Sequence, residues 1–106
     1  MCRLAVILIL FATCSATSWA TPEQATKLEF FESRIRPVLV KHCYRCHSVE
    51  SGKSKGGLHL DSRAGWQVGG DSGATIIPGK PDESLIIAAI SRNGDTSEMP
   101  PSEHLS

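Results

Sequence analysis

The chain has 106 residues, 41% of them hydrophobic, and carries 11 basic and 11 acidic side chains. This length accommodates one domain and excludes a two-domain enzyme, a barrel or a doubly wound sheet. The balanced charge, with neither a basic patch nor an acidic block, gives no indication of nucleic-acid binding or of a disordered acidic tail.

The hydrophobic residues are unevenly distributed along the chain. Residues 1–20 hold 15 of them, so only about a third of the remaining chain is hydrophobic. That remainder also contains all 9 glycines and all 6 prolines. A short chain with so lean a core usually needs a disulfide, a metal or a cofactor to stabilise it.

The first 20 residues have the three parts of a secretory signal peptide. Arg3 supplies a positive start, residues 4–12 form an unbroken apolar run, and Ser18 and Ala20 are small residues before a cleavage point at Thr21. We therefore predict a signal peptide at 1–20, one domain at 21–106, and a periplasmic or other extracytoplasmic location. The apolar run is shorter than the roughly 20 residues that span a bilayer. The alternatives are a retained segment that anchors the protein through residues 4–12, and lipidation of Cys14.

A helix is predicted to begin at Pro22. Thr21 suits the N-cap and Gln24 the partner position of a capping box, and the apolar residues that follow recur at helical spacing. Pro37 removes a backbone donor, which predicts a kink or break. Beyond it we expect the helix to resume and to continue through Cys43 to His47.

The later elements are short. We expect a polar loop at 51–57, an extended stub at Leu58–Leu60, a helical turn over 63–68 ended by Gly69-Gly70, and a buried turn at 76–79. A second helix is predicted to begin at residues 81–83, where a proline precedes two acids. A polar loop at 93–97 should follow it.

Residues 43–47 read Cys-Tyr-Arg-Cys-His, the attachment signature of c-type haem. Residues three apart lie on one face of a helix, so the thiols of Cys43 and Cys46 can both add to vinyl groups on one edge of a porphyrin. His47 then offers its imidazole to the iron. Haem attachment of this kind follows export, so the signal peptide supports the motif independently.

Two other interpretations of the cysteine pair are less well supported. A redox or disulfide clip of the thioredoxin type is expected near a βαβ pattern, which the sequence lacks. A zinc site needs four ligands, and no second cysteine pair follows residue 46.

Met99 is the predicted distal iron ligand. Once residues 1–20 are removed it is the sole methionine, and it lies in a proline-flanked loop far from His47. The alternative ligands are His42, tied to the proximal side, His104 near the terminus, and His59, which the alternation of Leu58 and Leu60 directs toward solvent. The carbonyl of Pro78 is our candidate acceptor for the second nitrogen of His47.

A series of short motifs falls in one order along residues 30–106. It comprises Ile35-Arg36-Pro37-Val38-Leu39, the Cys43–His47 motif, Gly56-Gly57-Leu58, Leu60-Asp61-Ser62, Gly69-Gly70, Pro78-Gly79, Ser84-Leu85 and Met99-Pro100-Pro101. This series resembles the planctomycete-type cytochrome c domain. The resemblance implies an all-α, class I-like cytochrome c fold around one covalent haem c, held by Cys43 and Cys46, with His47 and Met99 on the iron. His59 stands where that family often has Arg.

The sequence departs from the family pattern at its end. Related domains continue after the Met-Pro-Pro loop into a last helix that packs near the haem, whereas here residues 102–106 end the sequence. A gene fragment, a truncated product and a reduced stand-alone carrier are the competing explanations. The sequence thus predicts a domain of marginal stability.

The function predicted from these features is single-electron transfer rather than catalysis, because no base or nucleophile pairs with the haem. The expected partners are a redox protein of unknown identity and the haem-attachment machinery, without nucleic acid, and with a membrane only if the N-terminal segment is retained. The alternatives are a haem-based sensor or ligand-binding module, the N-terminal part of a larger exported redox protein, and a non-haem clip formed by Cys43 and Cys46.

Overall fold

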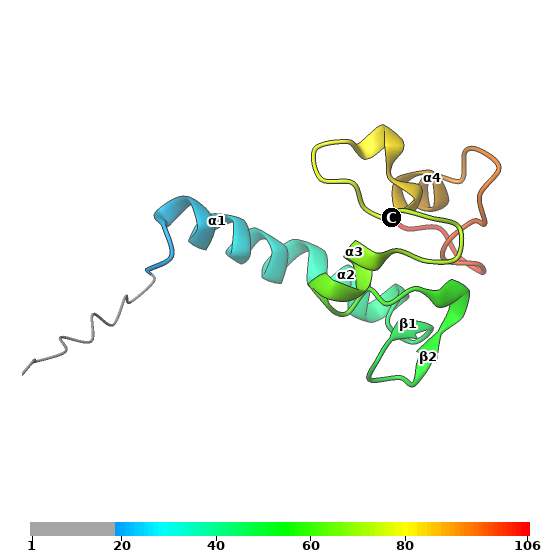
Figure 1. Cartoon of the computed structure of the whole chain (residues 1–106), viewed down its shortest axis with the longest axis horizontal. Helices are drawn as coiled ribbons and strands as arrows, with labels where there is room; N and C mark the ends of the chain where they lie inside the picture. The colour runs from blue at the N-terminus through cyan, green and yellow to red at the C-terminus, as the bar shows by residue number, and fades with distance from the viewer. Residues whose placement is uncertain (1–18) are drawn as a thin grey trace, which may run out of the picture.

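A computed structural model describes residues 19–106, so the predicted signal peptide lies almost entirely outside the described residues. The elements in chain order are α1 (Pro22–Phe30), the π-helical turn η1 (Phe31–Ile35), α2 (Arg36–His42), β1 (His47–Ser48), β2 (Lys53–Ser54), the 3-10 turn η2 (Lys55–Gly57), α3 (Arg63–Val68), the 3-10 turn η3 (Pro81–Glu83) and α4 (Leu85–Ser91). Figure 1 shows α1, η1 and α2 as one continuous rod leading into a body formed by the rest of the described chain. This part of the chain is mostly helical with little strand, which agrees with the predicted fold class in its coarse form.

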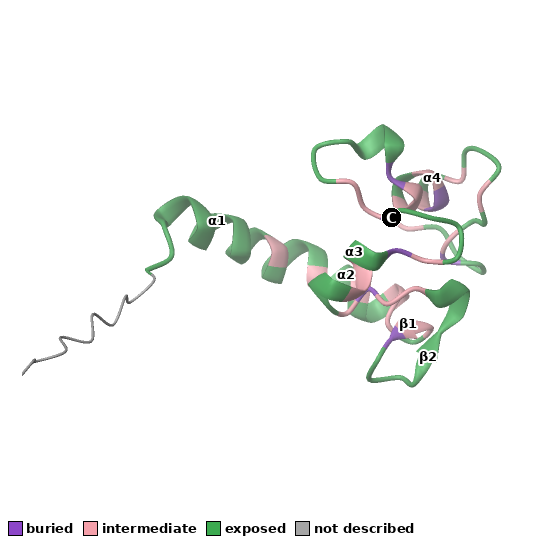
Figure 2. Cartoon of the chain, in the orientation of Figure 1, coloured by how far each residue is buried: buried purple, intermediate pink, exposed green. Residues whose placement is uncertain are grey.

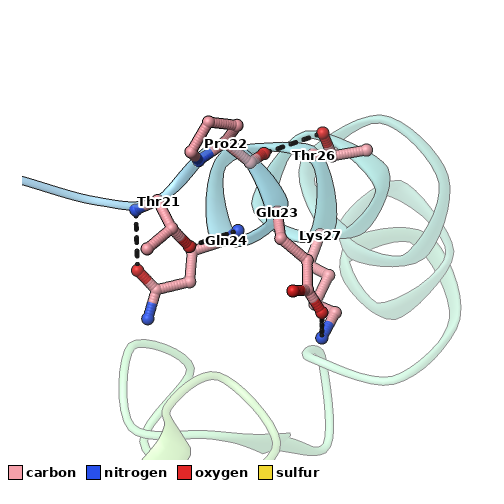
Figure 3. Close-up of polar contacts among 6 residues, drawn as sticks. All are labelled: Thr21, Pro22, Glu23, Gln24, Thr26 and Lys27. Carbon is pink, nitrogen blue, oxygen red and sulfur yellow. Dashed lines mark hydrogen bonds and ion pairs between the residues drawn. The ribbon is translucent and has the colours of Figure 1, made fainter.

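The start of α1 is fixed by local hydrogen bonds, as predicted. Gln24 N donates to Thr21 Oγ1 over 3.3 Å, and Thr21 N donates to Gln24 Oε1 over 2.9 Å, which completes a capping box (Figure 3). Glu23 and Lys27 form an exposed ion pair one turn apart. No residue of α1 is buried, so these local contacts rather than packing define the helix.

The helix passes Pro37 without breaking. The turn before it, η1, is widened to π geometry, and Arg36 N donates to Phe31 O across it. A proline ring would clash with the carbonyl four residues earlier in a regular helix, here that of Ser33, and the π turn spans this residue. The predicted interruption at Pro37 is therefore a local widening, after which α2 continues to His42.

The prediction that this helix reaches His47 is wrong. It ends at His42, and residues 43–46 form consecutive turns closed by bonds from Cys46 N and His47 N to Cys43 O, of 3.1 and 3.0 Å. His47 belongs instead to β1, where it pairs antiparallel with Ser54. Its carbonyl also accepts a bond from Leu60 N over 2.8 Å. These contacts with later residues hold His47 in extended backbone and so end the helix early.

The short helix predicted at residues 63–68 is confirmed as α3. Ser62 caps it by accepting a bond from Gly65 N over 3.0 Å, and Gly69 ends it with a φ of 80°. A side chain at Gly70 would place its Cβ 2.6 Å from Gly56 O, so the glycine allows two backbone segments to meet.

The second predicted helix begins later than expected. Residues 81–83 form only the 3-10 turn η3, and α4 starts at Leu85. The reason is the buried residue Ser84. Its hydroxyl accepts a bond from Ile77 N and donates to Lys80 O, each over 2.8 Å, and these contacts delay the start of the helix. The turn predicted to be buried at 76–79 is only partly so, since Pro78 and Gly79 are exposed.

The core of the described residues is small. Leu60 and Ala89 are the buried hydrophobic residues, and Ser48, Thr75 and Ser84 are the buried polar ones. Figure 2 shows that the rod is largely exposed while the buried positions lie within the body. Residues 101–106 contain no helix. None of the helices formed by residues 19–106 has the length and apolar character that crossing a bilayer requires.

Candidate cofactor site

A cavity of about 460 Å³ lies in the body of the domain. Cys43, Cys46, His47 and Met99, predicted from the sequence to hold the cofactor and its iron, all line it. Further lining comes from α4 and from the extended stub at 58–60, whose apolar lining residues are Leu58, Leu60, Leu85, Ile86, Ala89 and Ile90. Side chains from distant parts of the sequence thus converge on one largely apolar space.

The two thiols are positioned by the turns that follow α2. Cys43 and Cys46 are both half-buried and free, and Lys55 N donates to Cys46 O over 3.1 Å. Burial raises the pKa of the Cys43 thiol above its usual value, which keeps it protonated at neutral pH. Reactive C-x-x-C pairs of redox enzymes instead have a lowered thiol pKa. The environment of Cys43 therefore differs from that of a reactive redox thiol.

His47 is held in place by the hydrogen bonds of its backbone. One nitrogen of its imidazole ring makes no polar contact with the described residues. The Nδ1 atom is buried and has no hydrogen-bond partner. Buried polar atoms are almost always paired, so this unpaired nitrogen, on a residue that lines the cavity, marks the His47 ring as a candidate ligand-binding group. Nδ1 makes no hydrogen bond to the Pro78 carbonyl in this structure, where Pro78 is exposed and does not line the cavity.

Met99 reaches the cavity from the segment that follows α4. Its N–H donates to Ala89 O over 3.0 Å, which ties this segment directly to the helix that forms the apolar wall. Met99 is half-buried and Pro100 is buried. The structure therefore places the thioether-bearing residue and His47 on the lining of the same space.

The remaining imidazoles are not comparably placed. His42 lines the cavity, but its Nδ1 lies 2.8 Å from Glu103 Oε1. His59 and His104 do not line it. The expectation that His59 points into solvent is wrong, because His59 is half-buried. Its Cβ lies so close to Gly65 that a Cβ added at Gly65 would be 2.7 Å from it.

Charged residues that sequence reasoning did not assign to the site stand at the cavity. Lys41, Arg45 and Lys55 line it beside Glu103, whose pKa is lowered chiefly by its hydrogen bond to His42. No short-range motif points to Glu103, because its partner is 61 residues away in the chain.

Within residues 19–106, no three side chains of His, Cys, Asp or Glu lie close enough together to hold a metal ion. A structural zinc site requires four such ligands. A haem iron needs only axial ligands from the protein, because the porphyrin supplies the other four.

Comparison with known families agrees with this donor set. The family model described as Planctomycete cytochrome C matches residues 43–103, which include both thiols, His47, the apolar wall and Met99. The chain belongs to this family. Membership implies haem-based electron transfer, and an electron carrier rather than an enzyme. Searches of curated proteins and of solved structures each found no match.

Proposed function

We propose that this chain is an exported electron carrier that holds one haem c in the cavity described above. Cys43 and Cys46 would bind it as thioethers, and His47 and Met99 would be the axial ligands of its iron. The observation that carries the proposal is that these four residues line a single, largely apolar cavity.

The residues fit this group in chemistry as well as in place. A protonated thiol adds across a vinyl group by forming one C–S and one C–H bond, with no net oxidation, and the pKa of Cys43 is shifted toward that protonated form. When bound, the haem supplies the one-electron couple of its iron. The apolar wall excludes water, and a His/Met ligand pair favours a high reduction potential.

Export is the second part of the proposal. It is supported by the signal-peptide pattern of residues 1–20 and by the general extracytoplasmic location of c-type cytochromes. Expression of the full chain with its own leader, followed by fractionation and N-terminal sequencing, tests it. We expect the product outside the cytoplasm and beginning at Thr21; a product confined to the cytoplasm would refute export.

Covalent attachment is tested by producing the full chain in a host that contains the haem-attachment machinery. We expect the denatured protein to retain one haem, with a pyridine haemochrome spectrum typical of two thioethers. The Cys43→Ala/Cys46→Ala variant should lose the haem on denaturation. A wild-type protein of unmodified mass, with Cys43 and Cys46 joined as a disulfide, would instead favour the non-haem clip.

A further inference from the structure

Arg92, immediately after α4, has an unusual backbone conformation. Its φ and ψ are 55° and 31°, in the left-handed region that glycine normally occupies at the end of a helix. A residue other than glycine, asparagine or aspartate is disfavoured there. An arginine at this position therefore indicates a role for the side chain itself.

The guanidinium group of Arg92 contacts the segment around Met99 at three points. Nη1 donates to the carboxylate of Glu98, and Nη2 donates to Pro100 O and to Glu103 O, each over 2.6 Å. Only 15% of the Arg92 side chain is exposed. The first two contacts involve the residues directly before and after Met99, so the guanidinium holds both sides of that residue.

The same segment is attached to the domain at two further places. Met99 N donates to Ala89 O on α4, and the Glu103 carboxylate contacts His42 at the end of α2, next to Cys43. Arg92 itself does not line the cavity. It acts from behind the segment, as the group that keeps residues 98–103 in place between α4 and α2.

We propose that Arg92 is a positioning residue that keeps Met99 directed at the haem iron. This inference rests on the proposed function, because it takes Met99 as the distal ligand. Loss of the three contacts frees the segment, so that Met99 leaves the iron more often and an external ligand binds more readily. The apparent affinity for such a ligand rises with the population of the open state.

The substitution Arg92→Gly suits the test because glycine adopts the left-handed backbone without strain. It removes the contacts and leaves the end of α4 intact. Arg92→Lys keeps the charge but lacks the planar fork that serves several acceptors at once. Asn93→Gly is the matched control, because it adds the same flexibility one residue later, where the exposed side chain makes no polar contact with the described residues.

The experiment measures imidazole binding to the oxidised, haem-loaded protein by its absorption spectrum. We expect Arg92→Gly to bind imidazole about tenfold more tightly than wild type, Arg92→Lys to lie between the two, and Asn93→Gly to match wild type. Met99→Ala, included as a reference, should bind most tightly. Urea denaturation curves should show that Arg92→Gly and wild type are both folded under the conditions of the binding measurement, and the Met99 amide should exchange faster in the variant.

The outcomes separate the two proposals. If Met99→Ala binds imidazole no better than wild type, Met99 is not the distal ligand, and the proposed ligation fails together with the role of Arg92. If Met99→Ala binds more tightly but Arg92→Gly does not, only the role of Arg92 is refuted. Equal gains in Arg92→Gly and Asn93→Gly would also refute it, because loop flexibility would then account for the effect.

Discussion

The Nδ1 atom of His42 lies 2.8 Å from the Oε1 atom of Glu103, although the two residues are 61 positions apart in the chain. His42 is the last residue of α2 and precedes the first thiol, while Glu103 ends the segment that carries Met99. The contact thus joins the two sides of the cavity that are predicted to hold opposite faces of one cofactor.

This pair predicts a pH dependence of stability. The hydrogen bond to His42 holds the pKa of Glu103 below its ordinary value of 4.5. A lowered folded-state pKa contributes stability that is present above the ordinary value and is lost as the pH falls through the lowered one. The wild type should therefore resist urea better than Glu103→Gln near neutral pH, and the difference should disappear in acid.

The control for this prediction is Glu50→Gln, because Glu50 is exposed and makes no polar contact with the described residues. Its difference from wild type should be close to zero at every pH. A Glu103→Gln difference that persists below the folded-state pKa would show that the effect is not electrostatic.

Ser84 should be more important to stability than its size suggests. Its buried hydroxyl serves both Ile77 N and Lys80 O, and Ser84→Ala leaves the partly buried Ile77 amide without this partner. We expect a loss of about 1–3 kcal/mol in the free energy of unfolding, measured by urea denaturation. Ser91→Ala, at an exposed position of α4, should cost far less; equal costs would contradict the assigned role of the Ser84 hydroxyl.

Alanine variants of two glycines test how much a close backbone approach adds to the strain of a positive φ. Gly52 and Gly69 have similar positive φ values, 65° and 80°, but only a Cβ at Gly69 meets another atom, 2.5 Å away at Gly73 O. Both alanine variants should bear the strain of a positive φ, about 1–2 kcal/mol at Gly52 and about 1–3 kcal/mol at Gly69, whose ψ of −168° lies in a region essentially restricted to glycine. Gly69→Ala should be further destabilised by about 1 kcal/mol or more; similar losses at both sites would refute the close approach that shapes this side of the domain.

The domain should depend on its cofactor for tertiary structure. Leu60 and Ala89 are the buried hydrophobic residues of the described part, and they supply too little apolar burial to offset the loss of chain entropy. Chain made without haem attachment should lack a cooperative thermal transition and a near-ultraviolet circular dichroism signal. The loaded chain should melt below the roughly 45–65 °C typical of mesophilic domains. A sharp transition in the haem-free chain would contradict this dependence.

The parts of the structure that the sequence predicts are those set by residues near one another. The capping box of Thr21 and Gln24 spans three positions, and α3 ends at the glycine pair that follows it. The Cys-x-x-Cys-His motif is likewise local, and with Met99 it predicts the lining residues that should hold the cofactor.

The parts that the sequence does not predict depend on contacts between distant residues. The helix stops at His42 because His47 pairs with Ser54 and accepts a bond from Leu60 N, and no local signal announces either contact. Ser84 delays the start of α4 in the same way, through Ile77. The attachment of the Met99 segment to Arg92 likewise appears only once the chain is folded.

The central claim, a covalent haem whose iron lies between His47 and Met99, is tested most directly by the near-infrared spectrum of the oxidised, haem-loaded protein. A weak thioether-to-iron band should be present in the wild type and absent in Met99→Ala, which should still carry covalent haem with His47 on the iron. A band that is unchanged in Met99→Ala, or a wild-type protein that carries covalent haem without the band, would contradict the assignment of Met99.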